Sequence, residues 1–287
     1  MVIVAVTTWL IVGRALRPVE SIRREVEAIT TAGLDRRVPE PATGDEIGRL
    51  ARTMNRMLRR LESATERQRI FIADASHELR SPLTGIRTQL EVDLAHPEQA
   101  DWQRTDRDVL DETIRMQRLV DDLLLLARAD DDRFVAQHRR VDLDDIVLAE
   151  AHRLPTRTHH QLDIAAVAAG RIDGDPDQLA QLVRNLLDNA ARYATNRITI
   201  AVTESIGRVV LIVADDGPGI PDADRARVFE RFTRLDAARD RDHGGTGLGL
   251  AIADEIAKAH HATITIDNNH PGARFTVTFP VTHDPAE

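Results

Sequence analysis

One histidine lies where it could react with a bound partner. His77 belongs to the run ASHELRSPLTGI, Ala75–Ile86, which has helical periodicity, and it falls just off the apolar seam of that helix. An exposed imidazole can meet a reactant, and the neighbouring Glu78 could orient the ring or take its proton. Pro82 removes the intrahelical partner of the Glu78 carbonyl, and such breaks with local rules often mark function. The alternative is an ordinary solvated histidine.

Two asparagines share one face of a second expected helix, Asp177–Ala194. Asn185 and Asn189 are four residues apart, and Arg192 and Tyr193 follow one turn later. Amide oxygens are hard ligands that suit Mg²⁺, which prefers few protein ligands together with water and phosphate oxygens. The alternative is a polar helix face with ordinary caps.

A glycine-containing turn, DDGPGI at Asp215–Ile220, directly follows the expected strand Arg208–Ala214. A carboxylate at a strand end can accept a hydrogen bond from the exocyclic amine of adenine. Gly217 and Gly219 would let the backbone approach a ligand closely. Taken alone, the same residues also fit a simple tight turn.

The run HGGTGLGLAI, His243–Ile252, carries several glycines into the start of a helix. Free N–H groups at such a helix start form an anion site, although the spacing differs from the dinucleotide fingerprint. The alternative is a flexible loop followed by a helix. The glycines are Gly244, Gly245, Gly247 and Gly249.

The segment Phe229–Asp242 lies between these two runs. We expect Phe229 and Phe232 to anchor it, and Arg231 and Arg234 could reach phosphate. Its polar second half suggests a mobile lid, and the alternative is a solvated loop.

Composition narrows the possible chemistry. The 287 residues carry a net charge of −9, which argues against a nucleic-acid partner. Cysteine is absent, which excludes disulfides, thiolate metal sites and cysteine nucleophiles. Lys258 is the only lysine and lies in Ala-Lys-Ala, so neither a Walker A loop nor a Ser/Thr/Tyr-type kinase lysine is present. If the protein uses ATP, it holds the phosphates without a lysine.

The N-terminal elements suggest a membrane exit followed by a short relay. Val2–Gly13 is almost wholly apolar and arginines follow at once, as at the cytoplasmic end of a spanning helix; a buried or interfacial helix is the alternative. Pro18 is expected to open an amphipathic helix, and an extended connector, Leu34–Thr43, leads to a second helix capped by Asp45. Each of these two helices carries a stripe of apolar residues. The two apolar stripes fit a four-helix bundle in a parallel dimer, or else a simple helical hairpin. The stripes are Val19, Ile22, Val26 and Ile29, then Ile47, Leu50, Met54, Met57 and Leu61.

Two long helices follow, with a turn at His96 and Pro97. The apolar seam of the first helix alternates in steps of three and four residues, and that of the second begins with a step of seven and continues in the same way. This pattern predicts an antiparallel hairpin and again a dimeric four-helix bundle. The seams are Ile72, Ser76, Leu79, Leu83, Ile86 and Leu90, then Val109, Met116, Leu119, Leu123 and Leu126. From about residue 139, β-branched runs alternate with helical stretches, which predicts an α/β domain. The expected strands are 197–203, 208–214, 263–267 and 273–279, and the expected helices are 177–194 and 247–260.

Taken together, these motifs resemble the transmitter part of a bacterial membrane-bound sensor histidine kinase. ASHELRSPLTGI is similar to the phospho-acceptor box of that family, NLLDNAARY to its asparagine box, and DDGPGI, FERF and GGTGLGLAI to its later nucleotide-binding boxes. Pro18 and GDEIGRL, Gly44–Leu50, resemble the relay module known as HAMP. The resemblance implies four parts: the end of a transmembrane helix at 1–13, HAMP at 14–66, a dimerisation and phospho-acceptor hairpin at 67–131, and a Bergerat-type ATP-binding domain at 132–287. The implied fold is thus an all-α dimerisation bundle followed by an α/β sandwich.

The resemblance also implies a mechanism. His77 would attack the γ-phosphorus of ATP with Glu78 as the base, and phosphohistidine would then donate to an aspartate of a separate response regulator. Asp215 would take the adenine amine and Asn189 would bind Mg²⁺ with support from Asn185. Arg192 and Arg234 would meet phosphate, and Tyr193 would pack near the adenine. The glycine-rich residues expected to contact the nucleotide are Gly217, Gly219, Gly245, Thr246, Gly247, Leu248 and Gly249.

The resemblance places the protein in the cell membrane as a homodimer, with its kinase domains facing the cytoplasm. Ser81 stands where many phosphatase-active members carry Thr or Asn, which leaves phosphatase activity open. Two other readings remain: a scaffold that keeps the fold without catalysis, and an ATPase of the topoisomerase, mismatch-repair or heat-shock type. Intact motif residues argue against the scaffold, and the phospho-acceptor hairpin argues against the other ATPases.

Overall fold

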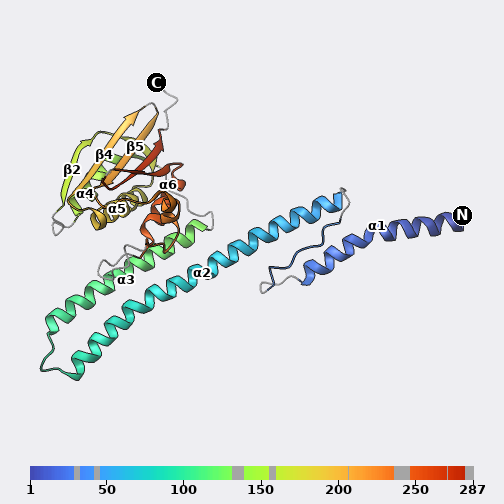
Figure 1. The fold of residues 1–287 in the computed structure, drawn as a ribbon, viewed down its shortest axis with the longest axis horizontal. Coiled ribbons are helices and arrows are strands. Elements are labelled where there is room, and N and C mark those ends of the chain that lie inside the picture. The colour runs from blue at the N-terminus through green and yellow to red at the C-terminus, as the bar shows by residue number, and fades with distance from the viewer. Residues whose placement is uncertain are drawn as a thin grey trace. The chain divides into compact units, whose positions relative to one another are not determined.

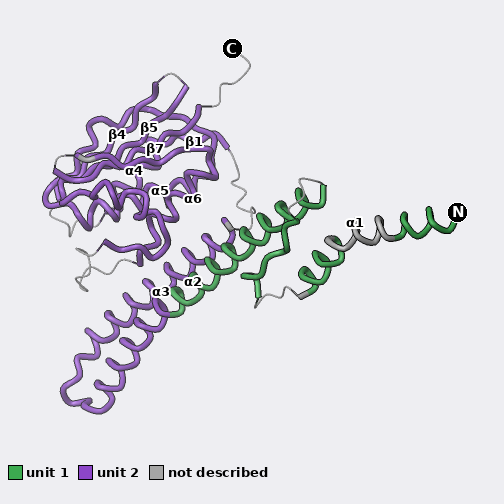
Figure 2. Tube along the Cα trace, turned by 45° about the vertical axis from the view of Figure 1, so that its right-hand side comes forward, with its two compact units in different colours: residues 1–76 green, residues 77–287 purple. Residues whose placement is uncertain are grey.

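The computed structural model describes residues 1–28, 33–41, 46–130, 139–154, 160–205, 207–235, 246–269 and 271–281. The chain divides into two compact units, residues 1–76 and 77–287, shown in different colours in Figure 2. Each unit is described by itself. No helix within the described ranges is long and apolar enough to cross a membrane.

The first unit contains helix α1 (Val2–Ala28), the connector 33–41 and the start of helix α2 (Glu46–Ala95). Its small core packs Ile22 of α1, Val38 of the connector and Ala51 of α2. The buried amide of Asn55 fixes the connector, because its Oδ1 accepts from the Val38 N–H at 2.9 Å and its Nδ2 donates to the Val38 carbonyl at 3.0 Å. The connector is therefore tied to α2; its described residues form no helix or strand and open with a turn at Leu34 and Asp35, and residues 42 and 43 lie outside the described ranges.

Three expectations for this unit need comment. The prediction that Pro18 opens a helix is wrong, because α1 begins at Val2 and runs on through Pro18. The predicted stripes are only partly buried within one chain: Ile22 is buried, whereas Leu50 and Met57 are exposed. The expected cap Asp45 and the stripe residue Ile29 lie outside the described residues.

The second unit begins with a helical hairpin, formed by the rest of α2 and by α3 (Trp102–Asp130), as Figure 1 shows. Helix α2 remains continuous through Pro82 and ends at Ala95, beside the predicted turn. Leu119 and Leu126 are buried, and a buried pair, Asp93 and Thr105, is hydrogen-bonded near the turn. The predicted hairpin is confirmed, with three seam residues, Ile72, Ser76 and Leu83, left exposed.

The α/β part of this unit contains a five-stranded sheet in the order β2-β4-β5-β7-β6, in which only β2 and β4 run parallel. A two-stranded sheet pairs β1 with β3. Figure 1 shows the helices against one face of the large sheet. The strands are β1 (Arg139–Asp142), β2 (Gln161–Val167), β3 (Arg171–Gly174), β4 (Arg197–Ser205), β5 (Arg208–Asp215), β6 (Thr263–Asn268) and β7 (Ala273–Pro280). The helices are α4 (Leu143–Arg153), α5 (Pro176–Tyr193) and α6 (Gly249–Ala259).

The predicted fold class, a helical segment followed by an α/β domain, is confirmed. Alternating apolar residues of the central strands meet the apolar faces of α5 and α6, so Leu186, Leu211 and Phe275 are fully buried. The sequence pattern did not predict β1, β2, β3 or α4. The three strands are short or carry many exposed side chains, which weakens their periodic signal.

A buried histidine joins the end of α6 to the start of α5. The His260 Nε2 accepts the backbone N–H of Asp175 at 3.0 Å, so the proton of the neutral ring is on Nδ1, which lies 2.8 Å from the Ile256 carbonyl oxygen. Asp175 in turn caps α5, because its side chain accepts from the N–H groups of Asp177 and Gln178. The helix that carries both candidate asparagines is therefore positioned at its first residue.

Candidate active site

A cavity of about 800 Å³ in the second unit collects most of the predicted nucleotide-binding residues. Its walls come from α5, α6, the turn after β5, the segment 218–235 and part of α3. The predicted residues that line it are Asn185, Asn189, Arg192, Tyr193, Asp215, Gly219, Arg234, Thr246, Gly247 and Gly249. Gly217 and Leu248 are buried and do not line the cavity, and Gly245 lies outside the described residues.

Asp215 ends strand β5 and is the most enclosed acid of the cavity, with 2% of its surface exposed. Its Oδ1 accepts the backbone N–H groups of Gly217 at 2.9 Å and Ala273 at 3.3 Å. Burial raises the pKa of Asp215, and the two N–H donors oppose that shift. A buried carboxylate held in this way is suited to accept a specific hydrogen bond from a ligand amine.

Close backbone packing around Asp215 explains why two positions are glycine. A Cβ at Gly217 would lie 2.1 Å from the Tyr193 carbonyl oxygen, and one at Gly272 would lie 1.8 Å from the Asp215 carbonyl oxygen. Gly272 also has a φ of +107°, which other residues rarely adopt. The turn after β5 is therefore packed against both the end of α5 and the loop before β7.

Asn185 and Asn189 face the cavity from α5, as their spacing predicts. Within the described part of the chain, the Asn185 Nδ2 is buried and has no hydrogen-bond partner. An unpaired buried amide costs free energy unless a ligand satisfies it, and a phosphate oxygen would do so. The two amide oxygens, with phosphate oxygens and water, make a donor set that suits Mg²⁺.

The glycine-rich segment is tied to the phenylalanine segment. Gly247 has a φ of +72°, and its carbonyl accepts the N–H of Phe232 at 3.0 Å. Leu248 is fully buried and precedes α6, which begins at Gly249. The expectation that Phe229 and Phe232 anchor the segment needs correction, because both are only half-buried and the buried anchor is Val228.

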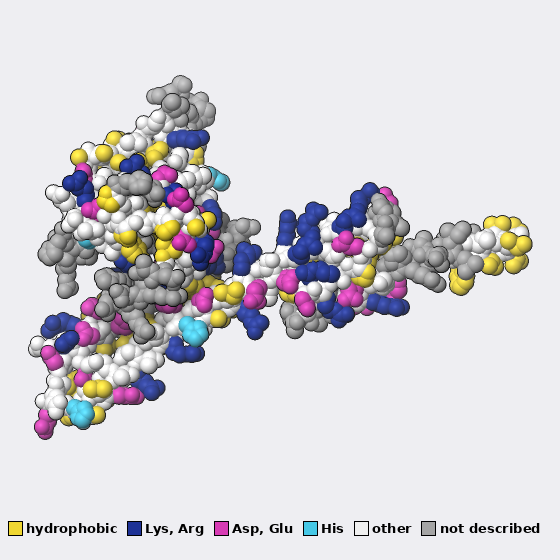
Figure 3. All heavy atoms as spheres, viewed as in Figure 1, with side chains coloured by type: hydrophobic (Ala, Val, Ile, Leu, Met, Phe, Trp, Pro, Cys, Tyr) yellow, Lys and Arg dark blue, Asp and Glu magenta, His cyan; other side chains and the backbone are white. Residues whose placement is uncertain are grey.

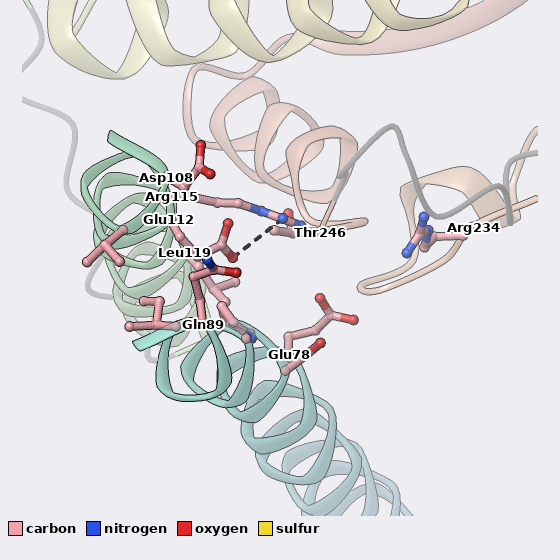
Figure 4. Close-up of a pocket in the computed structure, with 13 residues that line it drawn as sticks. Glu78, Gln89, Asp108, Glu112, Arg115, Leu119, Arg234 and Thr246 are labelled. Carbon is pink, nitrogen blue, oxygen red and sulfur yellow. Dashed lines mark ion pairs between the residues drawn. The ribbon is translucent and has the colours of Figure 1, made fainter. Parts of the chain in front are cut away.

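His77 and Glu78 lie on α2, away from the cavity that holds the asparagines. His77 is exposed, whereas the half-buried Glu78 lines a second cavity of about 520 Å³. Figure 4 shows Glu78 and Arg115 coming from the hairpin and Arg234 and Thr246 from the α/β part, with the Arg115 side chain pointing toward Thr246. The two spaces adjoin, because four residues line both: Arg115 and Leu119 of α3, with Arg234 and Thr246.

Residues of α3 form a polar contact that the sequence analysis did not identify. The Gln181 Nε2 of α5 donates to the Asp122 Oδ1 at 3.1 Å. Burial raises the pKa of Asp122 to about 6, against the opposing effects of Gln181 and nearby arginines. Arg115, Arg118 and Asp122 also line the larger cavity. Nothing in their local sequence pattern distinguishes them from a solvated helix face.

The chain matches three family descriptions in succession. The HAMP domain matches residues 10–63, the His Kinase A (phospho-acceptor) domain matches residues 67–132, and the histidine kinase-, DNA gyrase B- and HSP90-like ATPase matches residues 174–283. His77 and Glu78 fall within the second match, and the larger cavity falls mostly within the third.

Several curated proteins are similar along almost the whole chain. The probable sensor histidine kinase TcrY of Mycobacterium tuberculosis is 40% identical over 97% of this chain and 63% of its own length. The sensor histidine kinase CusS of Escherichia coli is 33% identical over 97% of this chain and 59% of its own length. The signal transduction histidine-protein kinase/phosphatase MprB of Mycolicibacterium vanbaalenii is 36% identical over 94% of this chain and 57% of its own length. The chain thus spans about three fifths of these relatives.

A solved structure supports the fold. The Acinetobacter baumannii histidine kinase AdeS superimposes with a TM-score of 0.58 at 24% identity, covering 72% of this chain and 98% of that one. At this identity the likeness concerns the fold alone.

Proposed function

Because the chain belongs to the sensor histidine kinase family, we propose that it transfers the γ-phosphate of ATP to its own His77. The observation that carries this proposal is the adjoining of two cavities within the second unit. The larger holds the candidate nucleotide residues, and the smaller is lined by Glu78, next to His77. The residues that line both cavities are Arg115, Leu119, Arg234 and Thr246, and a terminal phosphate would lie beside them.

The proposed reaction moves the γ-phosphoryl group of ATP to a nitrogen of His77 and releases ADP. An imidazole nitrogen of His77 attacks the γ-phosphorus, an N–P bond forms, the bond from that phosphorus to the β–γ bridging oxygen breaks, and ADP leaves. Glu78 takes the imidazole proton. Catalysis of this transfer is chiefly positioning and charge stabilisation, and Arg192 and Arg234 supply positive charge on this chain.

The adenine ring and the Mg²⁺ ion would bind at opposite ends of the proposed nucleotide site. Asp215 would accept the 6-amino group of adenine and Tyr193 would pack near the ring, while Asn189, supported by Asn185, would ligate Mg²⁺. Bound Mg²⁺ would neutralise charge on the phosphate oxygens. The unpaired Asn185 Nδ2 would donate to a phosphate oxygen.

The phosphohistidine would then donate to an aspartate of a separate response regulator. The name of MprB includes phosphatase activity, which is a property of that protein. Ser81 lines the smaller cavity here, so its hydroxyl could orient a water that hydrolyses the aspartyl phosphate of the regulator to aspartate and inorganic phosphate. Release of phosphate from a phosphorylated regulator, compared between the wild type and Ser81→Ala, tests this point.

We infer a parallel homodimer attached to the membrane. Large apolar side chains of both hairpin helices are exposed in the single chain, including Leu83, Leu110 and Leu124. Apolar side chains are exposed at the N-terminal end of the chain (Figure 3), among them Val2, Ile3 and Trp9. These residues and the HAMP match that follows support membrane attachment at the N-terminus, with the kinase domains on the cytoplasmic side.

Incubation with γ-³²P-ATP and Mg²⁺ tests the central proposal. We expect protein-bound label that is labile in acid and stable in base, as for phosphohistidine. ATP hydrolysis without protein-bound label would instead favour an ATPase of the gyrase or heat-shock type. Absence of both label and hydrolysis, with ATP still bound, would favour a scaffold.

A further inference from the structure

The carboxylate of Asp216 accepts hydrogen bonds from three consecutive backbone N–H groups. Asp216 directly follows Asp215, the residue proposed to contact the adenine amine. Its Oδ1 accepts from Thr195 at 2.8 Å, from Asn196 at 2.9 Å and from Arg197 at 3.0 Å. Its Oδ2 also lies 3.2 Å from the Asn196 nitrogen. Successive N–H groups that converge on one point form an anion-binding concavity, and here a side chain of the protein fills it.

The segment that Asp216 holds connects the nucleotide-binding helix to the sheet. Helix α5 ends at Tyr193 and strand β4 begins at Arg197, so the three donors span the junction. The hydrogen bonds, that from Arg197 first, lower the pKa of Asp216 below its ordinary value. The carboxylate is therefore ionised at neutral pH and remains a strong acceptor.

This junction is coupled to Asp215 through the backbone. Asp215 and Asp216 are consecutive, and Ile198 of β4 pairs with Asp215 of β5. On the other side, the Asn269 Nδ2 donates to the Asp215 carbonyl at 2.8 Å. Since Gly217 packs directly on the Tyr193 carbonyl, a shift of the junction would move the turn that aims the Asp215 carboxylate.

Asp216 itself is not part of the cavity wall. Tyr193 and Asp215 line the 800 Å³ cavity, whereas Asp216 is absent from its described lining and points to the junction instead. An effect of Asp216 on nucleotide binding would therefore pass through its neighbours.

We propose that Asp216 is a positioning residue that sets the Asp215 carboxylate against the 6-amino group of the bound base. The inference rests on the proposed function, in which Asp215 contacts that amine. It makes a selective prediction: loss of Asp216 weakens the contact at the base edge and leaves the phosphate end unaffected. A merely structural role would weaken the binding of every nucleotide alike.

The test compares ATP with purine riboside 5′-triphosphate, which differs only in carrying hydrogen in place of the 6-amino group. Equilibrium titrations with Mg²⁺ use the full chain as wild type, Asp216→Ala, Asp216→Asn and Asp216→Glu. For the wild type we expect ATP to bind at least about tenfold more tightly than the analogue, because the contact involves a charged acceptor.

The variants should change the two affinities unequally. In Asp216→Ala we expect ATP affinity to fall about tenfold and analogue affinity to fall less than about twofold. Asp216→Asn keeps an oxygen acceptor and should recover ATP affinity to within about threefold of the wild type. Asp216→Glu keeps the charge but displaces the oxygen by one methylene, so it should show the same selective loss, and it carries the test if the alanine variant does not fold.

The outcomes separate the inference from the proposal on which it rests. If the wild type binds both nucleotides equally, the contact between Asp215 and the amine is wrong, and the inference is overturned with it. If the wild type discriminates and Asp216→Ala, or Asp216→Glu in its place, discriminates equally well, only the positioning role is overturned. Equal losses for both nucleotides, or no rescue by Asp216→Asn, would overturn it as well.

Discussion

The helical hairpin and the α/β part of the second unit bury their apolar residues to very different extents. In the α/β part, Leu186, Leu211 and Phe275 are fully enclosed by neighbouring side chains. In the hairpin, Leu83 and Leu124 leave 53% and 52% of their surface exposed. Apolar patches of this kind mark an interaction surface. The α/β part therefore has a core of its own, whereas the hairpin leaves apolar surface exposed that the proposed dimer would cover.

The residues proposed for nucleotide binding and for phosphoryl transfer are also divided between these two parts. The proposed nucleotide ligands lie on the part with a core of its own, and the proposed nucleophile lies on the part that leaves apolar surface exposed. Binding should therefore survive changes that stop phosphorylation, and dimerisation should survive changes that stop binding. Four sets of substitutions test this comparison.

The largest effect is expected at the nucleophile. His77→Gln removes the nitrogen that would carry the phosphoryl group, so label from γ-³²P-ATP should fall to background while ATP affinity stays within about twofold of the wild type. His96→Gln, at an exposed histidine near the turn of the same hairpin, is the matched control and should label normally. Label on His77→Gln at the wild-type level would identify another acceptor.

The next effect concerns assembly. Leu83→Glu combined with Leu123→Glu would place charges in the expected four-helix core, at a cost of roughly 3 kcal/mol or more per site. Light scattering should show monomers, and labelling should fall together with the dimer, while ATP binding is retained. Thr88→Glu, on the opposite side of α2, should leave the dimer intact. An unmodified protein that is an active monomer would refute the assignment.

A smaller effect is expected in the binding part. Asp215→Ala and Asn189→Ala should each lower ATP affinity about tenfold or more, because each removes a hydrogen bond or metal contact that involves charge. Fluorescent-nucleotide titration measures this, and light scattering should still show dimers. Asp267→Ala, at an exposed position of β6, serves as the control. Unchanged affinity in both variants would exclude the proposed pocket.

The smallest effect is expected where the hairpin meets the α/β part. The pKa of Asp122 is raised to about 6, so its protonated form is favoured in the folded state. This group therefore contributes stability at low pH and loses it as the pH rises from about 4 through 6. Asp122→Asn mimics the protonated form and keeps an acceptor for Gln181.

Thermal melts at two pH values measure this effect. At pH 7.5 the Asp122→Asn variant should melt up to a few degrees higher than the wild type, and the difference should shrink towards pH 5. Arg118 and Arg184 oppose the shift and Asp121 reinforces it, so replacing Asp121 by Asn should move the wild-type dependence slightly towards lower pH. A difference that does not vary with pH would show that Asp122 does not titrate in this range.

The elements that the sequence predicts well are those with a long, regular pattern. The expected helix 177–194 and the observed α5, Pro176–Tyr193, differ by one residue at each end, because the apolar face repeats over several turns. Strand β3 has four residues and β2 exposes most of its side chains, so neither carries a period that could be recognised. Pro18 was a poor guide because a proline can be accommodated inside a helix as well as at its start.

The candidate site was predictable to the extent that its residues lie in contiguous motifs. Asp215 and the two asparagines reach one cavity as their spacing suggests. Asn269 and Gly272 were not identified, because their importance comes from contacts with the backbone of Asp215 across more than 50 positions of sequence. Asp216 was visible in the motif, but its role depends on the direction of its side chain, which the motif does not encode.

The hydrogen bonds of His260 bear on how a phosphorylated sample is interpreted. A phosphoryl group can be attached only to an imidazole nitrogen whose lone pair is free and accessible. In His260 the Nε2 lone pair is engaged by Asp175, the Nδ1 lies against the Ile256 carbonyl, and the ring is almost fully enclosed. In mass spectrometry, a phosphate found on the peptide containing His260 and His261 would therefore belong to His261 or to an unfolded fraction, which makes this peptide an internal indicator of non-specific labelling.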